Sequence, residues 1–287
     1  MPAVTIFAPA KVNLALEALG RRVDGYHEVR SVLQAVSFGD YLTFNPSNGT
    51  TFECDTPGWC AAQSLVSRAA ALIRAESGCQ KGVVIRITKS IPLASGLGGD
   101  ASDAAAVLRG LVALWGLTVA PERLTELAAG LGSDVPFFLR GGAALAQGRG
   151  EIISPLPALT GYWLVIMTPP VPRPAAKTAA VYARLGPGNF TDGSCTATLA
   201  ACLAKGARVA DEQLCNVFDD VADEVFPGLT TYRQIMREAG AARVHLAGAG
   251  PSLFGLFASR AEAEEVYGRL TGQSVFLAET LGPVVNE

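Results

Sequence analysis

The chain has 287 residues, of which 49% are hydrophobic and 17% charged, and its formal net charge is −3. This composition can fill substantial cores and argues against disorder, and the length suits one large domain or two ordinary ones. The acidic balance supplies no global positive field for nucleic acid. No apolar run predicts a membrane span, and the first residues do not resemble a signal peptide, so we expect a cytoplasmic protein without membrane or nucleic-acid partners.

The cysteines and histidines limit the metal chemistry. Six cysteines occur, none in a C-x-x-C pair, and their spacings suggest no zinc site. We therefore expect reduced thiols. With two histidines in all, His27 and His245, a histidine-rich metal centre is excluded by number.

The first 44 residues are expected to be mainly extended. Predicted strands cover Val4–Ala8, Lys11–Leu16, Val29–Val36 and Tyr41–Phe44. Pro9 should interrupt the first pair. Lys11 is the only charged side chain in the first 16 residues, and a cation within apolar strands needs a partner. We favour a functional role for Lys11 over a solvated surface lysine.

An aromatic residue and a histidine follow a turn at Asp24-Gly25. Tyr26 and His27 stand there side by side, at the start of a predicted strand. Together they could stack on a flat ring and hydrogen-bond to it. From composition alone, a half-exposed aromatic pair on a strand edge is the stronger interpretation.

A glycine-rich loop is the most informative stretch. It runs over residues 92–106, PLASGLGGDASDAAA, after a predicted strand at Val83–Thr88 and before a predicted helix at Ala104–Trp115. The unpaired amides and positive dipole at a helix start bind phosphate, and glycine lets the backbone approach closely. A simple strand-to-helix turn is the alternative. The loop lacks the G-x-x-x-x-G-K-[ST] pattern, and its G-x-G-x-x-G match lacks the last glycine.

Two further helices are predicted around this loop, over Ala61–Ala75 and from Pro121 to about Gly130. Asp134 then stands alone between the turn at Gly132 and a very apolar segment. A carboxylate at such a position is commonly a helix cap. It could also be a general base held in a dry pocket.

The second half is expected to be α+β, with helices on one face of a small antiparallel sheet. Domains are expected at 1–157 and 158–287. A small-residue strand is predicted at Gly141–Ala146, before this boundary, and further strands after it at Trp163–Thr168, Val244–Leu246, Leu253–Phe257 and Val275–Ala278. Predicted helices are Thr178–Leu185, Thr196–Ala204, Asn216–Phe226, Leu229–Ala239 and Ala261–Leu270. A second glycine loop, Ala247–Ser252, lies between two of these strands.

Three separated segments, APAKVNL at 8–14, PLASGLGGDASDAA at 92–105 and LAGAGPSLF at 246–254, share one pattern. In order and spacing they resemble the three motifs of the GHMP small-molecule kinases. Asp24-Gly25-Tyr26-His27, LGSDVPFF at 131–138 and Phe38-Gly39-Asp40 are similar to the members that phosphorylate a cytidine-diphosphate-linked sugar alcohol in the non-mevalonate route to isoprenoid precursors.

The resemblance implies a two-domain α+β fold, with an N-terminal ribosomal protein S5-like domain that binds ATP and a C-terminal ferredoxin-like α/β-plait domain. It also implies phosphorylation of the substrate's 2-hydroxyl, with ATP and Mg²⁺ as cofactors and the Mg²⁺ held mainly by ATP phosphates. The substrate would bind at the domain interface, and the protein would be a monomer or homodimer.

The resemblance also assigns site residues. Asp134 would be the base, with Lys11 beside it. ATP phosphates would be held by Pro92, Leu93, Ala94, Ser95, Gly96, Leu97, Gly98, Gly99, Asp100, Ala101 and Ser102. The substrate would be held by Asn13, Tyr26, His27, Thr178, Tyr182, Gly248 and Gly250, with the cytosine ring read by Tyr26 and His27 and stacked by Tyr182.

The phosphate loop departs from the family pattern at two positions. Asp100 replaces a glycine and should weaken nucleotide binding, and Ala101 replaces a serine that could touch phosphate or metal. Ser64 also stands near the usual place of an asparagine that contacts adenine. These departures favour, as an alternative, a catalytically weak cytidine-nucleotide-binding homologue. Another GHMP kinase, acting on mevalonate, homoserine or a sugar, has no use for the base-reading residues Tyr26 and His27.

Overall fold

The computed structural model describes residues 2–284. It has two compact units whose segments alternate along the chain. Unit 1 contains the residues up to Ala10, Gly39–Leu93 and Gly98–Arg140, and unit 2 contains Lys11–Phe38, Ala94–Leu97 and the chain from Gly141 onward. The domain boundary expected at 157/158 stays a prediction.

Extended segments and helices both occur throughout the described residues. The strands are β1 (Val4–Arg21), β2 (His27–Ser47), β3 (Thr50–Glu53), β4 (Gly82–Thr88), β5 (Ala143–Gln147), β6 (Ile152–Leu156), β7 (Trp163–Met167), β8 (Cys215–Asn216), β9 (His245–Leu246), β10 (Leu253–Phe257) and β11 (Val275–Glu279). The α-helices are α1 (Leu65–Ser77), α2 (Gly99–Trp115), α3 (Pro121–Leu131), α4 (Val135–Arg140), α5 (Lys177–Tyr182), α6 (Ser194–Ala204), α7 (Ala222–Val225), α8 (Leu229–Glu238) and α9 (Arg260–Arg269). Short 3-10 helices are η1 (Ala61–Gln63), η2 (Pro187–Asn189), η3 (Asp211–Gln213) and η4 (Val217–Asp220).

The first two strands are much longer than predicted. Val4–Arg21 forms one strand, so the expected interruption at Pro9 is wrong. Proline removes one donor from the ladder, but its fixed φ is compatible with an extended chain, so a strand can continue through it. The two strands expected within 29–44 are likewise one, His27–Ser47.

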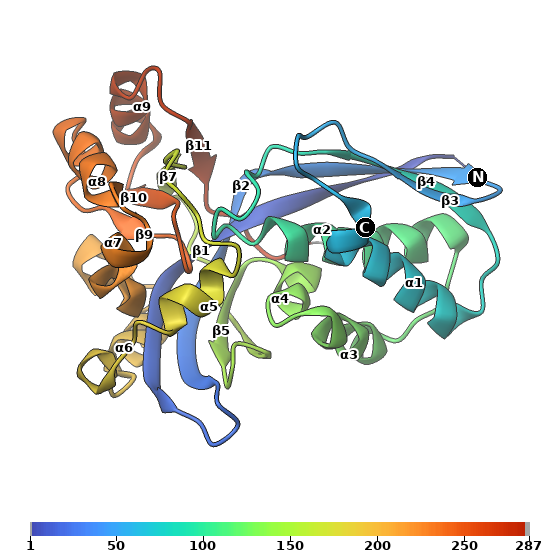
Figure 1. The fold of residues 1–287 in the computed structure, drawn as a ribbon, viewed down its shortest axis with the longest axis horizontal. Helices are drawn as coiled ribbons and strands as arrows, with labels where there is room; N and C mark the ends of the chain where they lie inside the picture. The colour runs from blue at the N-terminus through green and yellow to red at the C-terminus, as the bar shows by residue number, and fades with distance from the viewer. Residues whose placement is uncertain (1, 285–287) are drawn as a thin grey trace. The chain divides into compact units, whose positions relative to one another are not determined.

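In unit 1, part of β2 forms a sheet with β4 and β3. β4 is antiparallel to β2, with Tyr41 opposite Thr88, and parallel to β3, with Thr50 opposite Val83. Helices α1 and α2 contact each other and lie along one face of these strands (Figure 1). Helix α2 is buried almost all round, as its apolar sequence predicts, and it begins five residues before the predicted start.

Unit 2 contains a second, fully antiparallel sheet in the order β11-β7-β10-β9. Its core includes apolar residues of β7 and β10 together with residues of α8 and α9. Figure 1 shows both helices beside this sheet. The expected antiparallel sheet of the second half is confirmed. The unit also holds β5, which pairs with β2 and β6, and β8, which runs parallel to β1.

The helix expected over Asn216–Phe226 is wrong in its first half. Asn216 ends β8, and its side-chain oxygen accepts a hydrogen bond from Phe218 N (3.0 Å), which starts η4 instead. An asparagine that bonds its own backbone competes with helix formation, and the pattern of apolar residues does not reveal this. The short elements β3, β6 and α4 were not predicted.

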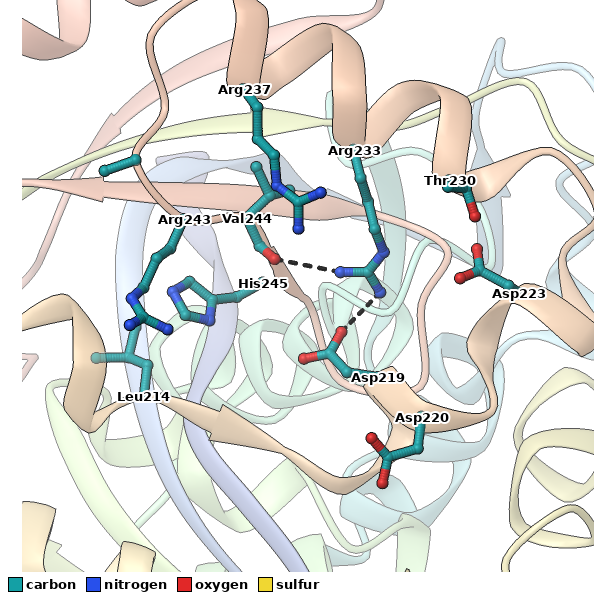
Figure 2. A pocket seen from close by; sticks show the side chains of 11 residues that line it. Leu214, Asp219, Asp220, Asp223, Thr230, Arg233, Arg237, Arg243, Val244 and His245 are labelled. Atoms are coloured by element: carbon teal, nitrogen blue, oxygen red, sulfur yellow. Dashed lines mark hydrogen bonds and ion pairs between the residues drawn. The ribbon is translucent and has the colours of Figure 1, made fainter.

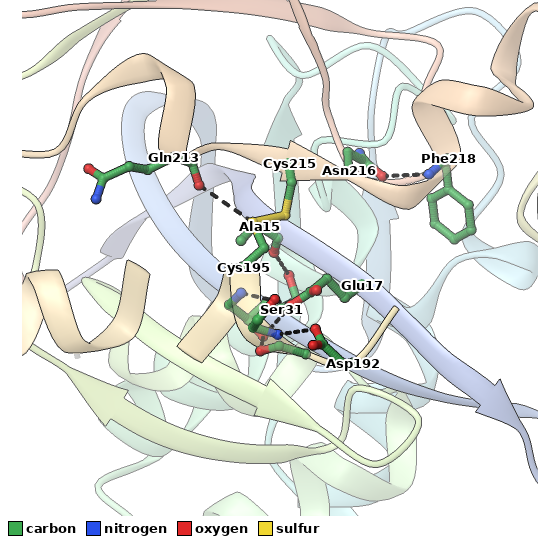
Figure 3. The surroundings of a disulfide bond; sticks show 12 residues. Ala15, Glu17, Ser31, Asp192, Cys195, Gln213, Cys215, Asn216 and Phe218 are labelled. Atoms are coloured by element: carbon green, nitrogen blue, oxygen red, sulfur yellow. Dashed lines mark hydrogen bonds between the residues drawn. A yellow bond between two sulfur atoms is a disulfide. The ribbon is translucent and has the colours of Figure 1, made fainter. Parts of the chain in front are cut away.

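Two of the six cysteines expected to be reduced are joined. Cys195, in the first turn of α6, forms a disulfide with Cys215 of β8, across a Cα–Cα distance of 6.8 Å (Figure 3). β1 brings them together, because β8 pairs with it at Ala15 and the buried Glu17 accepts hydrogen bonds from Thr196 N and Oγ1, each 2.7 Å. Residues 195 and 215 are too far apart in sequence for spacing to show this.

In the described part of the chain, no helix is long and apolar enough to cross a membrane.

Candidate active site

The N-terminal lysine lies in a buried polar chain on β1. Lys11 is 5% exposed and Asn13 4% exposed. Lys11 Nζ donates to Asn13 Oδ1 (2.7 Å), Asn13 Nδ2 donates to Ser31 Oγ (2.7 Å), and that hydroxyl donates to Ala15 O (2.7 Å). The chain of bonds fixes the Asn13 amide with its oxygen toward the lysine, so Lys11 is a positioned cation and not a solvated one.

The second glycine loop packs directly on this lysine. A Cβ added to Gly248 would lie 3.1 Å from Lys11 Nζ and 3.3 Å from Asn13 Oδ1, and Gly248 has φ +56°. Asn216 Nδ2 donates to Gly248 O (2.9 Å) and to Leu246 O (2.8 Å), which holds the loop in place. Glycine is therefore required where the loop passes Lys11 and Asn13.

The middle of the phosphate loop also belongs to unit 2 and meets the same loop. Lys11 N donates to Leu97 O (3.0 Å), and Ser252 N donates to Ser95 O (3.1 Å). A Cβ on Gly96 would lie 2.8 Å from Gly250 O. The Lys11 segment, the middle of the phosphate loop and the loop at 247–252 thus come together within unit 2, although up to about 240 residues separate them in sequence.

The two ends of the phosphate loop are tied together in unit 1 by a buried ionic cluster. Lys89 Nζ donates to Asp40 Oδ2 (2.5 Å) and to Asp103 Oδ2 (2.7 Å), and all three side chains are almost inaccessible. Asp40 also accepts from Ser90 N (2.5 Å) and Ile91 N (2.8 Å), just before the loop. Burial raises the pKa of Asp103, against the opposing effect of Lys89.

The loop then enters α2 through a glycine. Gly98 caps the helix with φ +78°, and α2 begins at Gly99. In this first turn Ser102 Oγ and Asp103 Oδ1 are buried without a hydrogen-bond partner in the described structure. Near the unpaired amides of a helix start, such a hydroxyl can donate to a phosphate oxygen, and such a carboxylate oxygen can coordinate a cation.

An aromatic group forms elsewhere in unit 2. The rings of His27 and Tyr182 are stacked, with centroids 5.1 Å apart and an interplanar angle of 26°. Phe218 meets Tyr182 edge-on at 4.8 Å, and Phe190 meets His27 at 5.9 Å. Burial, aided by the charge of Arg21, lowers the pKa of His27 and favours the neutral imidazole.

Tyr26 does not join this stack. Its side chain is 58% exposed, and the Arg149 guanidinium lies 4.9 Å from its ring centroid. Thr178 is exposed in the first turn of α5. Asp134 belongs to unit 1, in the turn between α3 and α4, and is half-buried. Lys11 belongs to unit 2, so the expected pairing of Asp134 with Lys11 stays a prediction.

A pocket of about 650 Å³ elsewhere in unit 2 contains none of the predicted residues. Figure 2 shows Arg233 within it, donating to Asp219 Oδ1 (2.6 Å) and to Val244 O (3.2 Å). It is also lined by Asp220, Asp223, Arg237, Arg243 and His245. Three aspartates stand against three arginines, so the lining is a polar surface without a strong preference for one charge.

Comparison with known proteins identifies the family. The GHMP kinases N terminal domain matches residues 64–142, and the GHMP kinases C terminal domain matches residues 197–274. A 4-diphosphocytidyl-2-C-methyl-D-erythritol kinase of Dehalococcoides mccartyi is 48% identical over 283 residues, 98% of this chain and 99% of that protein. The chain belongs to the 4-diphosphocytidyl-2-C-methyl-D-erythritol kinases.

Other relatives agree. A 4-diphosphocytidyl-2-C-methyl-D-erythritol kinase of Symbiobacterium thermophilum is 41% identical, covering 91% of this chain and 92% of that protein. A crystal structure of 4-(cytidine 5'-diphospho)-2C-methyl-D-erythritol kinase superposes with a TM-score of 0.82 at 34% identity, covering 97% of this chain and 99% of that one. Homoserine kinase from Cytophaga hutchinsonii, at 21% identity and a TM-score of 0.70, shares the fold. The expected two-domain α+β fold and the ATP-dependent small-molecule kinase activity are therefore confirmed.

Two lysines near the glycine loops were not anticipated. Lys89 joins the two ends of the phosphate loop through its ion pairs with Asp40 and Asp103. The available sequence signal was a lysine directly after the predicted strand that ends at Thr88. Lys177 begins α5 and donates to Gly250 O. The run Ala175-Ala176-Lys177 carries no periodic or motif signal in the sequence. Only the fold brings Lys177 to the glycine loop, 73 residues away.

The unusual Asp100 has a structural partner. Its carboxylate accepts hydrogen bonds from the Ser64 hydroxyl (2.5 Å) and from Leu65 N (3.2 and 3.1 Å), at the N-terminus of α1. Ser64 in turn caps the same helix by accepting from Val66 N (3.2 Å). The positive end of the α1 dipole therefore offsets the negative charge of Asp100, which from the sequence alone was expected to weaken ATP binding.

We expect Asp100→Ala to lower the free energy of unfolding by about 1 kcal/mol, because an N-terminal helix acceptor is lost. Urea unfolding followed by circular dichroism measures the change. Asp100→Asn keeps an acceptor and should lose less. An unchanged midpoint in the alanine variant would show that the bonds to α1 contribute nothing to stability.

Proposed function

We propose that this chain transfers the terminal phosphoryl group of ATP to the 2-hydroxyl of 4-diphosphocytidyl-2-C-methyl-D-erythritol. The observation that carries the proposal is the near-full-length 48% identity to a kinase of that name. The site geometry supports it, because a buried lysine and two glycine loops provide the charge and backbone contacts that phosphoryl transfer requires.

Asp134 is the proposed base. Its carboxylate accepts the proton of the substrate's 2-hydroxyl as that oxygen forms a bond to the γ-phosphorus of ATP. The bond between the γ-phosphorus and the bridging oxygen to the β-phosphate breaks, and ADP leaves with those electrons. The proton then passes from Asp134 to solvent, which regenerates the carboxylate.

Lys11 and Asn13 act on the reacting groups. The ammonium of Lys11 stabilises negative charge on the transferred phosphoryl group. Asn13, whose amide is oriented by Lys11 and Ser31, holds the polyol or diphosphate of the substrate. Gly248 and Gly250 let the backbone approach the substrate here.

The residues Tyr26, His27, Tyr182 and Thr178 bind the cytidine end. The existing stack of His27 on Tyr182 supplies an aromatic surface, and the depressed pKa of His27 keeps the imidazole neutral, with one donor and one acceptor for a base edge. The ring geometry supports a cytosine packed against this group. Tyr26 and Thr178 are exposed and therefore accessible to a ligand.

The phosphate loop, residues 92–102, holds the ATP phosphates at the start of α2. Mg²⁺ bound with ATP would neutralise part of the charge on these phosphates. The described residues contain no group of three or more acidic, histidine or cysteine side chains able to hold a metal. Mg²⁺ would then be held chiefly by ATP, with the buried, unpartnered oxygens of Ser102 and Asp103 as the protein ligands that fit it.

A coupled assay of ADP release tests the function. The purified chain is given Mg-ATP with 4-diphosphocytidyl-2-C-methyl-D-erythritol, and in parallel with homoserine or mevalonate. ADP release that depends on the cytidine compound alone supports the proposal. Calorimetric binding of cytidine diphosphate without ADP release would instead indicate a binding protein.

We expect His27→Ala to raise the KM for the cytidine substrate by about 5- to 160-fold, because loss of base stacking costs ~1–3 kcal/mol. The KM for ATP, measured with the same variant, should stay unchanged. Steady-state kinetics with each substrate varied in turn provides both values. A change confined to the KM for ATP would place His27 outside the cytidine site.

A further inference from the structure

A second lysine reaches the glycine loop that packs on Lys11. Lys177 is half-buried at the start of α5, and its Nζ donates to Gly250 O. Gly250 N in turn bonds to Ala247 O (2.9 Å), within the turn that carries Gly248 past Lys11. Two ammonium groups therefore contact one turn of six residues, 247–252.

The charges around Lys177 are unfavourable for a lysine without an anion. Burial, and then the positive charges of Lys11 and Arg173, lower the pKa of Lys177 to about 7. Arg173 lies in the connection before α5, where its guanidinium donates to Pro169 O (3.4 Å). Two ammonium groups at one backbone turn, with a guanidinium whose charge acts on one of them, are typical of a site that binds a multiply charged anion.

Neither acidic residue on the helix packed against α5 is among the groups that shift the pKa of Lys177. Helix α7 contacts α5 and carries Asp223 and Glu224. Glu224 lies 3.7 Å from Arg184, as an exposed ion pair. The charges that act on Lys177 are those of Lys11 and Arg173.

We propose that Lys177 joins Lys11 and Arg173 in binding a phosphate group of the reactants, contacting it through the ammonium that now donates to Gly250 O. The inference rests on the proposed function, which supplies two sources of that group: the diphosphate of the cytidine substrate and the triphosphate of ATP. Lys177 is thereby a further binding residue for the reaction.

Binding of an anion by Lys177 must be linked to proton uptake. Below pH 7 most Lys177 side chains already carry the charge, whereas above pH 7 most are neutral in the free protein. A bound phosphate stabilises the charged form, so binding at pH 8 takes up close to one proton. The affinity should therefore fall as the pH rises above 7, by at most about tenfold per pH unit.

Isothermal titration calorimetry of the full chain at pH 8 tests this. Each ligand is titrated in two buffers with different ionisation enthalpies, which gives the number of protons taken up. One arm uses the cytidine substrate without nucleotide, and the other uses a non-hydrolysable ATP analogue with Mg²⁺. We expect proton uptake in the arm whose phosphate Lys177 binds.

Three variants make the result specific. Lys177→Arg keeps its charge at all these pH values, so we expect retained affinity with no proton uptake and no loss of affinity between pH 7 and 9. Lys177→Met should bind the same ligand at least about tenfold more weakly at pH 7. Lys205→Met, which removes an exposed lysine after α6, should behave as the unaltered chain.

The outcomes separate the two hypotheses. Binding without proton uptake in both arms, or uptake that persists in Lys177→Arg, would overturn the role of Lys177. Failure of the cytidine substrate to bind would overturn the proposed function, while the nucleotide arm would still decide whether Lys177 binds phosphate.

Discussion

Asp134→Asn is expected to lower kcat by about 10²- to 10⁴-fold and to leave the Kd for the cytidine substrate nearly unchanged. Asparagine has almost the same shape as aspartate but cannot take the proton of the 2-hydroxyl. The half-buried position in the turn before α4 lets the amide replace the carboxylate without a large change in packing. Steady-state kinetics gives kcat, and calorimetry gives the Kd.

Asp55→Asn is the matched control, because Asp55 is an exposed carboxylate in the same unit. Its kcat should equal that of the unaltered chain. If Asp134→Asn instead weakens substrate binding as much as it lowers kcat, Asp134 has a structural role and another group is the base. A thermal unfolding midpoint for each variant distinguishes loss of catalysis from loss of folded protein.

Lys11→Met should lower kcat by about 10²- to 10³-fold, as expected when one preorganised donor to developing charge is removed. The methionine keeps much of the apolar stem inside β1 but removes the ammonium beside Asn13. The side chain is 5% exposed, so solvent is poorly placed to replace that charge. Single-turnover measurements at saturating substrates isolate the transfer step.

Lys205→Met provides the control for a lost positive charge at an exposed site of unit 2. It should leave the single-turnover rate unaltered. A Lys11→Met variant that turns over at the normal rate would show that Lys11 only supports the Gly248 loop. Circular dichroism at matched concentration checks that this variant is folded.

Local patterns predicted the parts of the site that are encoded by neighbouring residues. The phosphate loop, the helix that follows it and the turn at residues 247–252 were found because glycine and apolar periodicity are visible within short windows. The residues that meet Lys11 come from segments about 85 and 240 residues further along the chain. Their resemblance, in order and spacing, to the three family motifs indicated that they belong to one site.

The remaining differences come from contacts that only the fold creates. Pro9 does not interrupt β1, and Asn216 turns the chain into η4 where apolar periodicity favoured a helix. Lys177 stands beside two alanines in sequence but donates to Gly250, 73 residues away. Asp100 contacts the start of a helix 35 residues earlier, which local rules could not reveal.

The Cys195–Cys215 bond closes a ring of chain that contains most of α6 and all of η3. A protease that cuts once inside this ring releases no fragment, because the two pieces stay covalently joined. They separate on a denaturing gel only after reduction. Nicked and intact molecules consequently migrate together without reductant, and the nick becomes visible only as two smaller bands when a reductant is present.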